Sequence, residues 1–345
     1  YIPYCTGHSL QRLLKKGLRT PTISARPARH LDSFFDHVAN YLVTMQHYFS
    51  GAQAFSAAEL YAGPFIRREG RDQRYPEQQV QRLVYNLNFP SRAGMQTPFT
   101  NLTIQLDASR RALDEERAVY GGEDESQLGA YLEEGRKFVV ALSNVLREGD
   151  ARGQPFTFPI STIILTQNFD WNERKWGDLT YKIFEATSKR GSFYFLNGLS
   201  GVIDPAASYA MCCRLTIDKR RLLTSLHKAH LLSESARRDL FKVMEEYGEI
   251  VRKIRNRGLW AYPDETGSIG VVTLNMPRLG FLSKGDENKL YSMLSNVLEV
   301  SRKLLKTKRE RLEAILKSKL MFDLPVTRTY LGTFSYHFNT IGVLG

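Results

Sequence analysis

The three cysteines are the residues of this chain best suited to redox or radical chemistry. Cys5 lies near the start, whereas Cys212 and Cys213 are adjacent and are followed by Arg214. A cysteine taken alone most often packs as a small buried side chain. A disulfide between neighbouring cysteines would be strained, so we expect this pair to stay reduced. A positive neighbour favours ionic thiol chemistry, whereas a thiol that donates a hydrogen atom needs a dry, apolar pocket.

The sequence lacks the common motifs for metal and phosphate binding. It contains no Cys-x-x-Cys, no His-Glu-x-x-His and no Gly-x-x-x-x-Gly-Lys-Ser/Thr. Its seven histidines are scattered, and none pairs with a serine or cysteine in a nucleophile motif. We therefore expect no metal site built from this chain and no P-loop.

The composition is that of a folded, basic protein. The 345 residues include 48 Lys+Arg and 36 Asp+Glu, which gives a net charge of +12 and favours a polyanionic ligand such as a nucleotide or nucleic acid. A hydrophobic fraction of 42% supports a large core and excludes global disorder. Few cysteines indicate a reducing, cytoplasmic setting. No apolar run reaches 18 residues, so we expect no membrane span.

Long amphipathic segments alternate with β-rich runs, which predicts an α/β fold. We expect helices over 31–49, 235–257 and 286–319, strands over 156–165, 192–196 and 270–274, and a polar loop over 121–127.

The helix expected over 286–319 carries a basic cluster that could bind nucleic acid. A solvated helix face is the better interpretation, because five apolar residues mark a core side: Leu304, Leu305, Leu312, Ile315 and Leu316. A non-enzymatic nucleic-acid-binding protein stays open as an alternative, and it would bind DNA or RNA with a steep salt dependence.

Six segments, taken in order, resemble the anaerobic (class III, glycyl-radical) ribonucleoside-triphosphate reductases. They are Tyr4-Cys5-x-Gly7-His8-x-Leu10, Gly51-Ala52-Gln53-Ala54-Phe55, Pro98-Phe99-Thr100-Asn101-Leu102-Thr103, Met211-Cys212-Cys213-Arg214-Leu215, Gly270 through Arg278, and Thr329 through Val343. No one segment is specific by itself, but together they span nearly the whole chain.

The resemblance implies a fold and a domain organisation. The fold is a ten-stranded α/β barrel made of two half-barrels, with a finger loop through its centre. Residues 1–345 would form an incomplete catalytic barrel core that includes this loop. We expect the N-terminal cone domain, and the C-terminal region with its glycyl radical and four-cysteine zinc site, to lie outside this sequence. Without them the chain alone would be inactive.

The resemblance also implies catalytic roles. Cys213, at the finger-loop tip, would become the thiyl radical that abstracts the 3′ hydrogen of the ribose. Cys212 is an extra thiol, which leaves open which sulfur carries the radical. Cys5 would lie on the opposite face of the sugar and donate hydrogen. Asn275 stands where oxygen-dependent relatives keep a second cysteine, so formate would be the reductant, held near Asn275 and Met211; a thiol protein stays an alternative.

Nucleotide contacts are expected in two places. Arg92, Gln96 and Asn101 would line the substrate cavity, with loop-anchoring hydrogen bonds as the equal alternative. The helix over 31–49 would contribute to a homodimer interface that binds ATP or deoxynucleotide effectors, with His30, Asp36 and Asn40 as contacts. A core-facing helix without ligands is the simpler alternative for that segment.

The remaining partner expected from the resemblance is an S-adenosylmethionine iron–sulfur activase, which generates the glycyl radical. We expect neither membrane nor nucleic acid as a partner. A glycyl-radical enzyme of the pyruvate formate-lyase type is the nearest enzymatic alternative. It would use both adjacent cysteines and leave Cys5 without a role.

Overall fold

A seven-stranded sheet organises the protein. The computed structural model describes residues 2–200, 208–210, 216–218, 266–318, 325–330 and 337–344. The strand order is β11-β10-β1-β2-β3-β6-β7. The strands span Cys5–Gly7 (β1), Gln53–Ser56 (β2), Thr100–Ile104 (β3), Ile160–Leu165 (β6), Phe193–Asn197 (β7), Thr266–Asn275 (β10) and His337–Leu344 (β11). The five strands from β1 to β7 in this order are parallel, and the parallel pair β10–β11 runs antiparallel to them.

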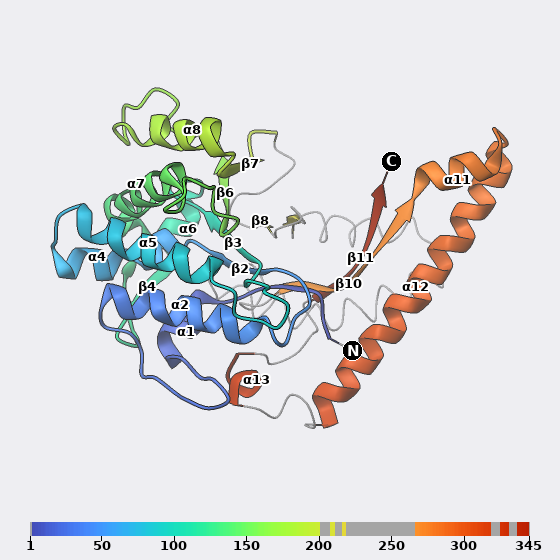
Figure 1. Cartoon of the computed structure of the whole chain (residues 1–345), viewed down its shortest axis with the longest axis horizontal. Helices are drawn as coiled ribbons and strands as arrows, with labels where there is room; N and C mark the ends of the chain where they lie inside the picture. The colour runs from blue at the N-terminus through green and yellow to red at the C-terminus, as the bar shows by residue number, and fades with distance from the viewer. Residues whose placement is uncertain are drawn as a thin grey trace.

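Helices from the first half of the chain gather beside the parallel strands (Figure 1). They are α1 (Leu10–Lys16), α2 (Leu31–Met45), α3 (Ala58–Tyr61), α4 (Gly63–Glu69), α5 (Arg74–Asn88), α6 (Arg110–Glu115), α7 (Leu132–Glu148) and α8 (Leu179–Arg190), with a 3-10 turn at Leu128–Tyr131. At the other end of the molecule α11 (Met276–Ser283) and α12 (Glu287–Ser318) lie by β10 and β11 (Figure 1). The short helix α13 covers Pro325–Tyr330.

The two faces of the parallel sheet differ in composition. Side chains alternate along a strand, and the set that faces the helices, here called the outer face, joins the main hydrophobic core: Phe55, Leu102, Ile104 and Ile163. The opposite set, here called the inner face, includes small and polar residues that are equally buried: Cys5, Ala54, Asn101, Thr103 and Thr162. The outer face therefore holds the helix layer, and the inner face is available for chemistry.

Two of the helices expected from the sequence are present, and they differ from the expectation in one end and in one core residue. Helix α2 ends at Met45 rather than at residue 49, although Phe49 is still fully buried. Helix α12 matches the segment 286–319, and Leu305 and Leu312 are buried as expected. The assignment of Leu304 to the core side was wrong, because it is 60% exposed. The helix expected over 235–257 lies outside the described residues.

The expected strands are also present, and one expected loop is not a loop. Strand β6 begins at Ile160, directly after the cis Phe158–Pro159 bond, and not at 156. The segment 121–127 was wrongly expected to be a loop. It contains strand β5 (Glu123–Gln127), which forms a hairpin with β4 (Arg117–Tyr120) through two glycines with positive φ, Gly121 and Gly122. Of the ten strands expected for a barrel, the described residues place seven in one sheet.

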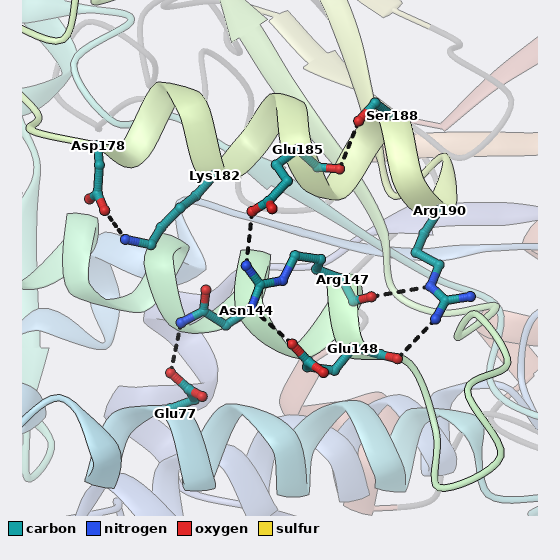
Figure 2. A network of polar contacts seen from close by, with 9 residues as sticks. All are labelled: Glu77, Asn144, Arg147, Glu148, Asp178, Lys182, Glu185, Ser188 and Arg190. Carbon is teal, nitrogen blue, oxygen red and sulfur yellow. Dashed lines mark hydrogen bonds and ion pairs between the residues drawn. The ribbon is translucent and has the colours of Figure 1, made fainter.

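Polar contacts join the helices that cover the parallel strands (Figure 2). Arg147 on α7 forms an ion pair with Glu185 on α8 (2.9 Å). The Arg190 guanidinium at the end of α8 donates to the backbone oxygens of Arg147 and Glu148 (both 3.1 Å), where the negative end of the α7 dipole favours a cation.

Among the helices that the structure describes, none is both long and apolar enough to cross a membrane.

Candidate active site

Cys5 occupies the inner face at the centre of the sheet. It lies on β1, between β10 and β2, and only 2% of its surface is exposed. It packs with Ala52 and Ala54. Burial among small apolar groups excludes water and disfavours a charged sulfur. This environment suits a thiol that gives or takes a hydrogen atom.

Gly51 allows a backbone segment to approach this thiol closely. A Cβ placed on Gly51 would lie 2.7 Å from the Cys5 Sγ and 2.9 Å from the Tyr4 backbone oxygen. The Gly51 amide also donates to that Tyr4 oxygen at 2.7 Å. A glycine is thus required here, which gives a physical reason for the first residue of the Gly51-Ala52-Gln53 segment.

A buried polar network continues the inner face away from Cys5. The Asn101 amide donates to the Thr162 hydroxyl (3.1 Å), and the Thr103 hydroxyl donates to the Asn101 oxygen (3.3 Å). Next to them, Gln105 donates to the Ser56 hydroxyl (3.4 Å). All five side chains are at least 97% buried. Asn101 lies two strands from β1, which is about 10 Å across the sheet. Polar groups at this depth are typical of a ligand cavity wall.

The strand alternation in Asn101-Leu102-Thr103 could have revealed this network, because it places polar side chains on one face of a buried strand. Our sequence reading selected only Asn101 from it. Ser56, Thr103 and Thr162 were missed, because threonine and serine in a β-rich run are also what a purely structural strand contains.

The other two expected substrate contacts lie elsewhere. Arg92 and Gln96 pair across an exposed turn before β3, with the Arg92 amide donating to the Gln96 oxygen at 3.1 Å. This bond joins two backbone atoms and involves neither side chain. Their role in substrate binding stays a prediction.

The structure does not bring Asn275 next to Cys5. Ser268 is the residue of β10 opposite Cys5, and Asn275 ends the strand seven residues later. At about 3.3 Å per residue this separates the two positions by roughly 20 Å. The exposed Asn275 side chain instead accepts from the Arg278 amide (2.9 Å) and caps α11. Ser268, fully buried and on the same face as Cys5, is the nearer polar neighbour on β10.

Met211, Cys212 and Cys213 lie outside the described residues. The two strands that flank them in sequence are described: β8 (Ser208–Ala210) pairs antiparallel with β9 (Thr216–Asp218). Strand β8 lies against β3, which carries Asn101 and Thr103. The ribbon that leads to the adjacent cysteines therefore contacts a strand of the polar network.

A second candidate site is a basic pocket at the N-terminus of α2, about 640 Å³ in volume. It is lined by Arg26, Pro27, Ala28, Arg29, His30, Ser33, His37 and Gly121. The volume is within the range of small-molecule sites. Positive side chains and the positive end of a 15-residue helix dipole favour an anion there.

His37 is the most informative residue of this pocket. It is 91% buried, and among the residues that the structure describes its Nδ1 atom has no hydrogen-bond partner. Burial lowers its pKa from the ordinary value, with Asp36 acting weakly in the opposite direction. A buried nitrogen without a partner is costly, so a ligand that supplies the missing partner would bind favourably.

Only one of the three expected effector contacts lines the pocket. His30 does, whereas Asp36 is in an ion pair with Arg82 of α5 (2.6 Å) and Asn40 is exposed one turn further along α2. Arg26, Arg29, Ser33 and His37 also line the pocket and were not among the expected contacts. The basic run just before the helix was the available signal.

Neither site holds a cluster of metal ligands: among the described residues no group of three or more histidine, cysteine, aspartate and glutamate side chains could hold an ion.

Comparison with protein families gives a match over the whole chain. Residues 1–345 match the model of the anaerobic ribonucleoside-triphosphate reductase family. The chain belongs to this family. A comparison with curated protein sequences gives no match.

Solved structures of anaerobic ribonucleotide reductases share the fold. The enzyme from Thermotoga maritima in complex with dATP and CTP superposes with a TM-score of 0.67 at 23% identity, over 99% of this chain and 50% of the other. The same enzyme with citrate in the active site gives 0.69 at 22% identity, over 99% and 54%. The chain thus spans about half the length of these reductases. At this identity the likeness establishes the fold.

Proposed function

We propose that this chain carries the central part of a ribonucleotide reductase, which binds a ribonucleoside triphosphate on the inner face of the sheet and reduces its ribose. The single observation that carries the proposal is the buried thiol of Cys5 on that face, continued by the polar network of Asn101, Thr103 and Thr162. Family membership supplies the reaction class. The complete site would lie within a ten-stranded barrel.

The proposed division of labour uses two thiols. Cys213 would act as a thiyl radical, formed by loss of its thiol hydrogen atom to a glycyl radical held elsewhere in the enzyme. It would take the 3′ hydrogen and return it at the end, because S–H and activated C–H bonds are of similar strength. Cys5, on the opposite face of the sugar, would give a hydrogen atom while the 2′ hydroxyl leaves as water. Formate, which leaves as carbon dioxide, or a thiol protein, which leaves as a disulfide, would supply the two electrons that complete the reduction and restore the Cys5 thiol.

The residues around Cys5 contribute by exclusion and orientation. Ala52 and Ala54 pack with Cys5, and the Gly51 backbone lies against its sulfur, so these residues limit the access of water to the thiol. The amide and hydroxyls of the polar network could exchange their mutual hydrogen bonds for the hydroxyls or phosphates of a nucleotide. Ser268 completes the polar rim on the β10 side.

The basic pocket on α2 is the proposed effector site. Arg26 and Arg29 would hold nucleotide phosphates, and His37 Nδ1 would gain the partner that it lacks. His30 stays an effector contact. Asp36 and Asn40 lie outside the pocket and would contribute to the surface that contacts the second subunit of a dimer. The neutral state of His37 leaves Nδ1 as an acceptor or donor, according to its tautomer.

Cysteine substitutions test the catalytic proposal in the full-length natural protein, activated without oxygen and supplied with ribonucleoside triphosphates. We expect Cys5→Ala and Cys213→Ala each to lower the rate of deoxynucleotide formation by about 10³-fold or more, since each removes a reacting group. Nucleotide affinity should change little. Cys212→Ala is the matched control and should keep most activity. Activity that survives Cys5→Ala but is lost in Cys212→Ala would contradict the proposal and favour the pyruvate formate-lyase type of chemistry.

Direct binding tests the effector proposal. Arg29→Ala should weaken the binding of dATP, measured by calorimetry, by about 10-fold, because one charged contact to phosphate is lost. Arg152→Ala removes an exposed arginine remote from the pocket and should leave the affinity unchanged. Equal weakening in both variants would show a general charge effect and refute a site on α2.

A further inference from the structure

We propose that Gln53, His8 and Tyr41 form a positioning relay, which holds the Gly51 backbone against the Cys5 thiol and ties it to helix α2. The proposal rests on the proposed role of Cys5. All three side chains are at least 97% buried, on the outer face of the sheet or on α2. Their hydrogen bonds lead to the Gly51 backbone, so they would act on Cys5 through Gly51.

Three hydrogen bonds connect these groups in series. The Tyr41 hydroxyl lies 2.9 Å from His8 Nδ1, and His8 Nε2 lies 2.5 Å from Gln53 Oε1. Gln53 Nε2 donates to the Gly51 backbone oxygen at 3.3 Å. The series therefore begins on a helix, crosses strands β1 and β2, and ends at the residue beside Cys5.

The chemistry of the groups fixes the direction of every bond. Gln53 must turn its NH₂ towards the Gly51 oxygen, because two oxygens would repel there, so its Oε1 can only accept from His8. His8 Nε2 therefore carries a hydrogen, and Nδ1 of the neutral ring accepts from Tyr41. Burial lowers the pKa of His8 to about 4, which keeps the ring neutral at ordinary pH. Aligned donors of this kind strengthen one another in a low-dielectric interior.

The last link controls the thiol because the contact at Gly51 is already tight. The position of a Cβ on Gly51 would be 2.7 Å from the Cys5 Sγ, so the Gly51 backbone is itself one wall of the thiol pocket. A small rotation of that peptide would change the space open to the sulfur. Hydrogen-atom transfer depends on near-contact geometry, so such a change alters the rate more than substrate binding.

The first link connects the relay to the proposed effector pocket. His37, which lines that pocket, lies four residues before Tyr41, and both are buried on α2. Residues spaced by four are neighbours on one helix face. A displacement of α2 would therefore shift the Gly51 backbone through the hydrogen bonds of Tyr41, His8 and Gln53.

Gln53→Met breaks the relay with little change in volume. In the activated full-length protein we expect kcat to fall about 10-fold with KM changed less than two-fold, as a misplaced reacting group requires. In the unactivated protein, alkylation of Cys5 by iodoacetamide, followed by mass spectrometry, should become several-fold faster. Gln79→Met is the matched control: it makes the same change at a buried glutamine of α5 and should alter neither measurement.

Gln53→Glu supplies a pH-dependent rescue. The protonated carboxyl can accept from His8 and donate to Gly51, as glutamine does, whereas the carboxylate opposes the Gly51 oxygen. Burial raises the pKa of such a group, so kcat should approach the wild-type value at low pH and fall as pH rises, unlike in Gln53→Met. Titratable or charged groups close to the relay include Tyr330, whose ring lies 4.8 Å from that of Tyr41, together with Cys5, His337 and Arg12. These groups, and His8 and Tyr41 themselves, are the same in all variants.

The outcomes separate the relay from the proposed reaction. An unchanged Cys5 alkylation rate in Gln53→Met, or an equal change in Gln79→Met, would overturn the relay. So would a fall in kcat that is the same for both variants, or a Gln53→Glu profile identical to wild type. If the wild-type protein reduces no nucleotide, the proposed function fails, whereas the alkylation rates still decide whether Gln53 positions Cys5.

Discussion

The outer and inner faces of the parallel sheet are equally buried but are built from different residues. On β3, Leu102 faces the helices and belongs to the main core, whereas Asn101 and Thr103 face inwards and bind each other. On β1 and β2, Cys5 and Ala54 are inside, and Gln53 and Phe55 are outside. Burial alone therefore does not distinguish a core from a site. A site differs from a core when its buried groups would form more favourable interactions with a ligand than they form with one another.

The outer face contains polar groups too, and their arrangement shows the difference. His8 and Gln53 are bound in a fixed series, and His337 contacts the Thr6 hydroxyl at 3.1 Å. The Phe49 and His337 rings stack at 6.2 Å. These groups maintain the frame. The inner hydroxyls and amides bond mainly to one another, and a nucleotide could replace these bonds.

The largest expected effect on stability is at Leu102. Leu102→Ala should lower the free energy of unfolding by about 2–5 kcal/mol, because it leaves a cavity in the packed outer face. Urea titration followed by circular dichroism measures this change. A variant that loses activity but keeps its stability would refute a purely structural role for the outer face.

Acid should destabilise the outer face through its two buried histidines. Burial lowers the pKa of His8 to about 4 and that of His337 to about 3, below the ordinary value of 6.5. Between the folded-state pKa and 6.5, the unfolded chain binds protons that the folded chain does not. The contribution of these histidines to the free energy of unfolding is therefore fully present above pH 6.5 and is lost as pH falls towards the folded-state pKa. At pH 5 each histidine should cost about 2 kcal/mol relative to pH 7.

The buried carboxyl of Glu59 changes the free energy of unfolding with pH in the opposite direction to the histidines, so its contribution has to be removed before theirs is measured. Burial raises the pKa of Glu59 from 4.5 to about 7, so its contribution is present at low pH and is lost as pH rises through 7. Unfolding measured at pH 5 and pH 7 in a Glu59→Gln background removes this contribution. In that background His337→Gln should reduce the loss by about 2 kcal/mol. An undiminished loss would show that other groups are responsible.

A smaller and functionally opposite effect is expected on the inner face. Thr103→Val preserves shape but removes the hydroxyl that donates to Asn101. We expect kcat/KM for the ribonucleotide to fall about 10-fold, or about 1.4 kcal/mol, with unfolding changed by less than about 1 kcal/mol. Steady-state kinetics and urea titration on the same preparation give both numbers. A large stability loss with unchanged kcat/KM would make the two faces alike.

The smallest effect is expected in the polar contacts of the helix layer (Figure 2). Arg147 and Glu185 are each about one-third exposed. Arg147→Ala should therefore cost less than about 1 kcal/mol, and less still in high salt. Thermal unfolding at two salt concentrations measures this, and a cost above about 2 kcal/mol would show that α7–α8 packing depends on these charges.

Local patterns in the sequence predicted five of the described elements, namely α2, α12, β6, β7 and β10. The spacing of Leu31, Phe34, Val38 and Leu42 gave α2, and apolar runs gave β6, β7 and β10. The end of α2, the β4–β5 hairpin and the exposure of Leu304 were missed, because they depend on tertiary packing and on a two-glycine turn.

The candidate site was less predictable. The Cys5 position followed from its motif, but the neighbours of Cys5 depend on strand register, which one sequence does not give. Register places Ser268 opposite Cys5 and moves Asn275 to the far end of β10. The pocket residues Arg29 and His37 are likewise brought together by the entry of the chain into α2.

The distance between the Cys5 and Cys213 sulfurs tests the central claim most directly. It should be measured in a crystal structure of the full-length protein with a ribonucleoside triphosphate bound. The account predicts that the two sulfurs lie on opposite sides of one ribose, with Cys5 on the inner face and Asn101 and Thr103 on the same wall. A Cys213 sulfur placed on the outer side of the sheet, or at the surface away from the sugar, would contradict it.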